Sequence, residues 1–150
     1  MVDAIRGFHN EYYFLSNFYA SPIIHDGIIF PTVEHAFQSE KTLNDDIRLA
    51  ISFCKTPSEA KYMGRSVNLR DDWEDIKYSR MKLFVNKKFK IPALKKYLLA
   101  TGDALLVEEN TWNDRTWGTV NGKGKNLLGK ILMEVRSDIQ KKVLERSLRK

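Results

Sequence analysis

The sequence predicts one α+β domain over residues 1–150, mostly helical, with a small antiparallel β element. Three observations support this fold class. The final segment has a long amphipathic helical pattern, several earlier helices have recognisable first turns, and one segment carries a hairpin signal. A chain of 150 residues has the usual length of one domain with one core. No linker-like tract and no internal repeat divides the chain.

The first predicted elements are a hairpin and two short helices. Asp26 and Gly27 lie between two β-branched runs, which predicts an antiparallel hairpin over residues 23–30. Pro31 and Thr32 then begin a helix that we expect to break near Asn44. A second helix is expected over residues 45–54.

Four further elements follow in order. Thr56, Pro57 and Glu59 form the signature of a helix start, and Gly64 is predicted to close that helix. We expect a basic helix to begin at Asp71, a helix between Pro92 and Gly102, and a short buried strand over residues 104–107. The long terminal helix is predicted from apolar residues at helical spacing, namely Leu128, Ile131, Leu132, Val135 and Ile139.

Composition limits the classes of partner. The chain has 43% hydrophobic and 29% charged residues, as soluble domains do, and no apolar run long enough for a membrane span. Its start lacks the pattern of a secretory signal, so we expect a cytoplasmic protein without a membrane partner. Cys54 is the only cysteine and the three histidines lack metal-ligand spacing, so we expect no disulfide, metal or cofactor.

Positive charge is concentrated in residues 77–96, which contain eight Lys or Arg and no acidic residue. Such a stretch is typical of a surface that meets nucleic acid or phosphate. An ordinary solvated helix face is an equal alternative, because core-like residues recur between the cations at helical spacing.

The first helix carries the chemically distinctive residues. Glu34, Gln38 and Lys41 stand at i, i+4 and i+7, so one stripe presents a carboxylate, an amide and an amine. Taken alone, this stripe is more typical of a solvent-exposed face than of a site.

Three other segments favour the interpretation as a site. The segment around Asn17 and Phe18 combines an amide with aromatic rings suited to sandwiching a planar group. Residues 112–118 place two indoles around Asp114, as in a binding loop. Residues 121–126 precede the terminal helix and resemble a phosphate cradle, although a simple turn into the helix fits equally well.

A set of motifs in a fixed order resembles the NADAR family, also called YbiA-like, over roughly residues 5–140. The motifs are Leu-Ser-Asn-Phe-Tyr (15–19), Pro-Thr-Val-Glu-His-Ala-Phe-Gln (31–38), Thr-Pro-Ser-Glu-Ala-Lys (56–61), Met-Gly-Arg (63–65), Arg-Asp-Asp-Trp-Glu (70–74), Asp-Arg-Thr-Trp-Gly (114–118) and Gly-Lys-Asn-Leu-Leu-Gly-Lys (124–130). The resemblance implies a mostly helical fold and an N-glycosidase. Such enzymes cleave the bond between a ribose carbon and a base-like nitrogen.

On that resemblance we expect Glu34 and Asp114 to be the catalytic carboxylates. Glu34 is assigned to the sugar side and Asp114 to the leaving group or to substrate hydroxyls, and the two roles can be exchanged. Lys41 is the third catalytic candidate, because a lysine amine can hold the opened sugar as a Schiff base when its pKa is depressed.

The remaining candidates are substrate-binding residues. Trp73 and Trp117 are suited to stacking on a ring and Arg65 to pairing with a phosphate, although Trp73 is equally suited to anchoring its helix. Asn17 and Asn126 are suited to reading polar edges. The full set is Asn17, Phe18, Gln38, Arg65, Trp73, Trp117, Gly118 and Asn126. His35 is interpreted as a buried imidazole with satisfied hydrogen bonds.

Three functions follow as alternatives. The first is an N-glycosidase acting on the phosphorylated ribosylamino-pyrimidines of riboflavin synthesis. The second removes ADP-ribose from guanine in nucleic acid, which the basic stretch and the net charge of +6 favour. The third is a non-catalytic module that binds NAD or ADP-ribose. The segment before Asp114 is unusual for the family because it contains Trp112. This difference bears on which substrate is bound and not on the reaction class.

Overall fold

The computed structural model describes residues 2–149. The chain divides into two compact units. The first unit consists of the two ends of the chain, up to Ser16 and from Phe89 onward, and the second unit is the continuous segment Asn17–Lys88. The mostly helical α+β class is confirmed, whereas the single domain over residues 1–150 stays a prediction.

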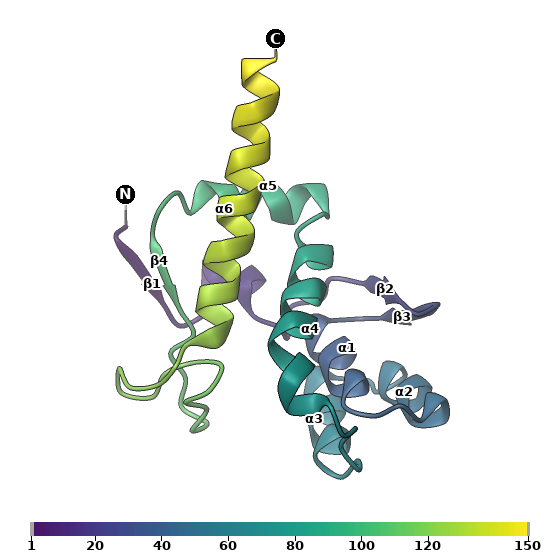
Figure 1. Ribbon diagram of the computed structural model, residues 1–150. Coiled ribbons are helices and arrows are strands. Elements are labelled where there is room, and N and C mark those ends of the chain that lie inside the picture. Colours follow the sequence, from purple (N-terminus) through teal and green to yellow (C-terminus); the bar gives the residue numbers. More distant parts are fainter. Residues whose placement is uncertain (1, 150) are drawn as a thin grey trace. The chain divides into compact units, whose positions relative to one another are not determined.

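The second unit contains a hairpin and four helices (Figure 1). These are β2 (Ile23–His25), β3 (Ile28–Phe30), α1 (Val33–Glu40), α2 (Asp45–Ser52), α3 (Pro57–Arg65) and α4 (Trp73–Lys88). The hairpin is confirmed: β2 and β3 pair antiparallel, and Asp26 and Gly27 both have positive φ, at 50° and 76°. Positive φ at both central residues is the geometry that makes Asp-Gly a preferred hairpin turn.

The first turns of three helices are fixed by side-chain caps. Thr32, Asn44 and Thr56 each accept a hydrogen bond from the backbone N–H three residues further on, at 3.1, 3.0 and 3.1 Å. These bonds satisfy N–H groups that have no partner inside the helix. The local signals therefore place the helix starts correctly, and α1 begins one residue after its cap.

Four helix boundaries differ from the prediction. The first helix ends at Glu40 instead of near Asn44. The second helix ends at Ser52 instead of residue 54, and the basic helix begins at Trp73, two residues after Asp71. Gly64 does not close α3, which continues through it to Arg65. Its backbone has no positive φ, so this glycine serves a different purpose, described below.

The core of the second unit surrounds α1. This helix packs against α2, α3 and α4 and also contacts both strands of the hairpin. Each of its eight residues is buried, the polar ones included. Apolar residues that complete this core are Phe30, Val33, Ile51, Met81 and Phe84.

The first unit combines a parallel strand pair with helices. Its elements are β1 (Ala4–Arg6), a 3₁₀ helix η1 (Asn10–Leu15), α5 (Pro92–Ala100), β4 (Leu105–Val107) and α6 (Leu127–Leu148). The expected helices and the strand near residues 104–107 are confirmed. The structure adds β1, which pairs parallel with β4 and lies beside it in Figure 1. A strand of three residues is too short to show alternation in the sequence.

The core of the first unit lies where α6 packs on β4 and α5. Leu128, Ile131, Leu132 and Val135 are all buried, as the helical pattern predicts, together with Leu106 from β4. In residues 2–149, none of the helices is both long and apolar enough to cross a membrane.

Candidate active site

The polar stripe on α1 is not a solvent-exposed face. The exposed fraction is 7% for Glu34 and 4% for Gln38. A buried carboxylate or amide is unfavourable unless it is hydrogen-bonded, so each polar group of this helix needs a partner inside the protein.

Glu34 and Gln38 are partners of one another. The side-chain Nε2 of Gln38 donates a hydrogen bond of 2.8 Å to Oε1 of Glu34, as the i, i+4 spacing allows. The backbone N–H of Glu34 donates to the carbonyl oxygen of Asn17 at 3.1 Å. The start of α1 is therefore attached to the segment that the sequence had singled out around Asn17.

Lys41 directly follows α1 and is half-buried. Burial lowers the pKa of its ammonium group, and the nearby charges of Arg65, Lys61 and Lys77 lower that pKa further. The carboxylate of Glu34 acts in the opposite direction and raises it. The balance favours a larger neutral fraction of the amine, which is the form that can attack a carbon atom.

Trp73 and Asn17, two of the predicted binding residues of the second unit, have identified neighbours within it. Trp73 is buried at the start of α4, and its ring lies 5.1 Å from that of Phe37. This contact fits the anchoring interpretation, and stacking on a substrate stays a prediction. Asn17 is buried and directs Nδ2 toward the sulfur of Met81 at 3.5 Å. Phe18 is half-buried, and Arg65 is exposed in the last turn of α3.

His35 is a buried imidazole with both ring nitrogens bonded, as the sequence analysis interpreted it. Nε2 lies 3.0 Å from the carbonyl oxygen of Cys54, and Nδ1 lies 2.8 Å from Oγ1 of Thr32. A carbonyl can only accept, so Nε2 carries the proton and Nδ1 accepts from the threonine hydroxyl. Burial lowers the pKa of this imidazole, which keeps it neutral.

Sequence reasoning missed Glu40, the last residue of α1, which pairs with three arginines. Its carboxylate is 2% exposed and lies 3.1 Å from Arg48, 3.0 Å from Arg80 and 3.5 Å from Arg70. The three arginines come from α2, from α4 and from the segment before α4. No local pattern reveals such a group, because its members are far apart in the sequence.

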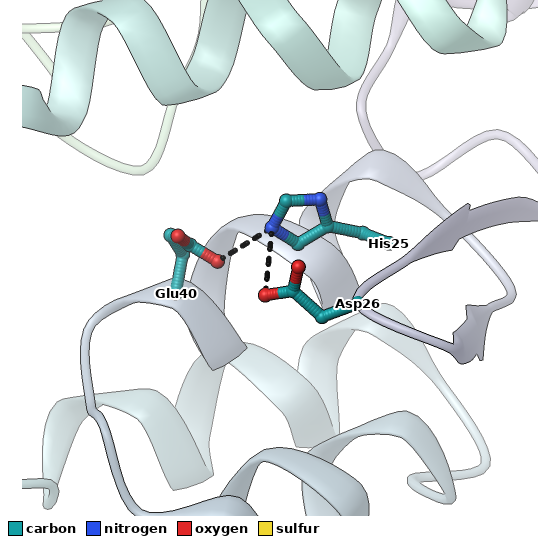
Figure 2. A group of neighbouring side chains, drawn as sticks. All are labelled: His25, Asp26 and Glu40. Carbon is teal, nitrogen blue, oxygen red and sulfur yellow. Dashed lines mark ion pairs between the residues drawn. The ribbon is translucent and has the colours of Figure 1, made fainter.

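Among the described residues, His25, Asp26 and Glu40 form the one cluster with the spacing of metal ligands (Figure 2). The imidazole Nε2 lies 3.4 Å from Asp26 Oδ2 and 3.2 Å from Glu40 Oε2. The guanidinium of Arg48 lies 3.0 and 3.1 Å from the same two oxygens. A cationic side chain already neutralises these carboxylates, so the cluster fits an ion-pair network better than a metal centre.

Asp114 belongs to the first unit, in the loop between β4 and α6. Its Oδ1 accepts hydrogen bonds from the backbone N–H groups of Thr116 and Trp117, at 3.0 and 2.9 Å. Asn110, which the sequence analysis did not single out, holds the backbone of Asp114 from both sides. Its Oδ1 accepts from the Asp114 N–H and its Nδ2 donates to the Asp114 carbonyl. The carboxylate is thus fixed in orientation by local bonds.

The other three predicted residues of the first unit lie near this loop in the sequence and also serve its structure. Asn126 accepts from the Glu108 N–H and donates to the Leu106 carbonyl, both at 2.9 Å. Gly118 is buried, and a Cβ there would come within 2.0 Å of the Glu108 carbonyl oxygen. Trp117 is half-buried. The substrate-binding roles of these residues stay predictions.

Comparison with known proteins identifies the family. The model of the NADAR domain matches residues 6–140, which is most of the chain. The chain belongs to the NADAR domain family. Within it, the chain is 43% identical over 146 residues to the N-glycosidase YbiA of Escherichia coli (strain K12), covering 93% of this chain and 91% of that protein.

Other NADAR relatives carry related names. The chain is 40% identical to an N-glycosidase of Nostoc punctiforme, covering 83% of this chain and 84% of that protein. It is 38% identical to a riboflavin biosynthesis protein of Vibrio vulnificus, covering 85% of this chain but only 35% of that protein. The NMR structure of E. coli YbiA matches with a TM-score of 0.85 and 42% identity, covering 97% of this chain and 90% of that one. The NADAR resemblance inferred from the ordered motifs is confirmed.

Proposed function

We propose that the protein is an N-glycosidase that hydrolyses the bond between ribose and a base-like nitrogen in phosphorylated ribosylamino-pyrimidines. The observation that carries the proposal is the buried pair of Glu34 and Gln38 beside Lys41, whose pKa burial lowers. The names of the relatives, N-glycosidase and riboflavin biosynthesis protein, support the reaction and this class of substrate.

The proposed mechanism gives each carboxylate a role that depends on the charge that develops on the substrate. As the C–N bond breaks, the sugar gains oxocarbenium character, which a carboxylate stabilises. Glu34 is proposed to act on the sugar side, where it accepts a proton from the water that forms the new C–O bond. Asp114 is proposed to supply the proton for the leaving nitrogen or to bind substrate hydroxyls. The two assignments can be exchanged.

Lys41 offers a covalent variant of the same reaction. Its neutral amine forms a C–N bond to the anomeric carbon of the opened sugar while the base leaves with a proton, and water then hydrolyses the imine and restores the amine. Borohydride reduction during turnover is expected to leave a stable adduct on Lys41. Absence of an adduct, or an adduct that survives in Lys41→Ala, would exclude this variant.

The central test is release of ribose 5-phosphate from a ribosylamino-pyrimidine phosphate. We expect turnover by the wild-type protein and a loss of at least about 100-fold in kcat for Glu34→Gln, because the amide keeps the shape but not the charge. Glu145→Gln, which changes an exposed carboxylate of α6, is the control and should retain activity. A folded wild-type protein that releases no ribose 5-phosphate would disprove the proposal.

Two further measurements on the same proteins test the two alternative functions. Release of ADP-ribose from a guanine-modified oligonucleotide, with salt-sensitive binding, would favour the nucleic-acid substrate. The basic stretch supports this alternative less once its contacts are known, because Lys88 is buried, Arg80 pairs with Glu40 and Lys77 pairs with Glu74. Binding of NAD or ADP-ribose without turnover, unchanged in Glu34→Gln, would favour the non-catalytic module.

A further inference from the structure

The side chain of Gln38 lies between Glu34 on its own helix and Gly64 on α3. Its Nε2 donates to the Glu34 carboxylate at 2.8 Å. Its Oε1 is buried and has no hydrogen-bond partner among the described residues. A side-chain amide with one satisfied and one unsatisfied end is unusual in a protein interior, so something must hold it in this orientation.

Gly64 is the neighbour that makes this orientation possible. A Cβ at position 64 would come within 2.0 Å of Oε1, 2.8 Å of Cδ and 3.0 Å of Cβ of Gln38. The distance to Oε1 is far below any real contact of a Cβ, and the distance to Cδ is slightly shorter than the closest real contacts. The amide can therefore occupy its place only while residue 64 has no side chain.

Backbone conformation does not explain this glycine. Gly64 lies inside a regular helix and has no positive φ, and in that position alanine is the more favourable residue. Gly64 is buried where α3 packs on α1. What the glycine provides is close approach between the two helices at Gln38.

The direction of the amide also has a chemical meaning. An ionised carboxylate only accepts hydrogen bonds, so the amide must present its N–H₂ to Glu34. A donated hydrogen bond favours the charged form of a carboxylate and fixes its rotamer. An amide turned the other way would place its oxygen against the carboxylate and repel it.

We propose that Gly64 is a positioning residue: its missing side chain lets Gln38 hold the ionised carboxylate of Glu34 in the orientation that the reaction needs. This inference rests on the proposed function, in which Glu34 acts on the sugar. It assigns Gln38 an action through Glu34, in keeping with its burial. In this role both residues act on the rate through Glu34, and the substrate-binding role of Gln38 stays a prediction.

The experiment is a double-mutant cycle with Gly64→Ala, Gln38→Ala and the double variant. We expect Gly64→Ala to lower kcat by roughly 10- to 100-fold with KM within twofold, since small displacements of a catalytic group have effects of this size. The melting temperature of Gly64→Ala should not fall in proportion to its loss in kcat, because alanine favours the helix. In the Gln38→Ala background, Gly64→Ala should reduce kcat by less than about twofold, because the two severe contacts no longer exist.

A pH profile distinguishes positioning from general loss of structure. In Gln38→Ala the acid limb of kcat is expected to move to higher pH, because the donor that favours the charged carboxylate is gone. Ser58→Ala, at an exposed position of α3, is the matched control for Gly64→Ala and should leave kcat and its pH profile unchanged. Wild-type kcat in Gly64→Ala, or equal losses in both backgrounds of the cycle, would overturn the proposal.

A readout independent of turnover separates this inference from the proposed function. In NMR spectra, the side-chain amide signals of Gln38 should follow the titration of the Glu34 carboxyl carbon, and this coupling should be lost in Gly64→Ala. A wild-type protein with the coupling but no glycosidase activity would overturn the function and leave the Gly64 contact established. A wild-type protein without the coupling would overturn the inference itself.

Discussion

Lys88 is an example of how strongly burial acts on a single residue. Its side chain is 1% exposed at the end of α4, and its Nζ lies 5.7 Å from the centre of the Tyr19 ring. Burial lowers the pKa of its ammonium group from its ordinary value of 10.5 to about 7. A buried ammonium group is unfavourable, so this lysine is expected to reduce the stability of the second unit at neutral pH.

We predict that Lys88→Met stabilises the protein near pH 7 and that the gain disappears toward pH 10.5. In that window the unfolded chain binds a proton at Lys88 and the folded chain does not, so the stability of the wild-type protein rises with pH. Each kcal/mol gained raises the melting temperature by roughly 2–4 °C. Thermal unfolding of both proteins at several pH values measures the difference.

The exposed neighbour Lys90→Met is the control for that series. It removes the same charge without changing a buried group, so its melting temperature should follow that of the wild-type protein across the window. A gain for Lys88→Met that stays constant with pH would contradict the assigned cause.

At the scale of the element, Glu40 fixes the end of α1 in place. Its two carboxylate oxygens connect the end of α1 to arginines from α2, α4 and the segment between α3 and α4. The next residue along the chain is Lys41, whose carbonyl accepts the N–H of Arg70 at 2.8 Å. The end of α1 is therefore held by side chains and by the backbone.

We predict that Glu40→Gln destabilises the protein by about 3–5 kcal/mol, the range expected when one partner of a buried ion pair is removed. The arginines would remain largely buried without their shared counter-charge. The matched control is Glu74→Gln, which breaks the surface pair with Lys77; Glu74 is 75% exposed. Because exposed pairs contribute less than about 1 kcal/mol, its effect in urea unfolding should be small. Equal effects of the two variants would contradict the network.

Features formed by residues that are close together in the sequence could be predicted. The helix starts at Thr32 and Thr56 and the Asp26-Gly27 turn are local, since each involves residues within four positions, and the structure confirms them. The structure adds a cap at Asn44, where the sequence predicts only a break. The i, i+4 pair of Glu34 and Gln38 followed from helical spacing for the same reason.

Non-local features could not be predicted in this way. The partners of Glu40 are spread from residue 48 to residue 80, and the contact of Gly64 with Gln38 joins two helices. The sequence alone favours Gly64 as a helix stop, because a glycine near a helix end usually has that role. Lys88 was counted with a basic face because its spacing carries no sign of burial.

For the whole molecule, the two units differ in how they are built from the chain. The second unit is one continuous segment, whereas the first is assembled from both ends. In the first unit the parallel pair joins Ala4 to Leu105 and Arg6 to Val107. Contacts of such long sequence separation form slowly, because a long loop must close before they are gained.

The pairing of β1 with β4 has a consequence for the protein during its synthesis. When the nascent chain has left the ribosome up to residue 88, it contains every residue of the second unit. At that stage β4, the partner strand of β1, has not yet been translated. We predict that pulsed hydrogen exchange during refolding protects amides of α1 and α4 before those of β1 and β4. Simultaneous protection of both sets would show one cooperative step instead. Until β4 is translated, β1 lacks its partner strand and is open to chaperones and proteases.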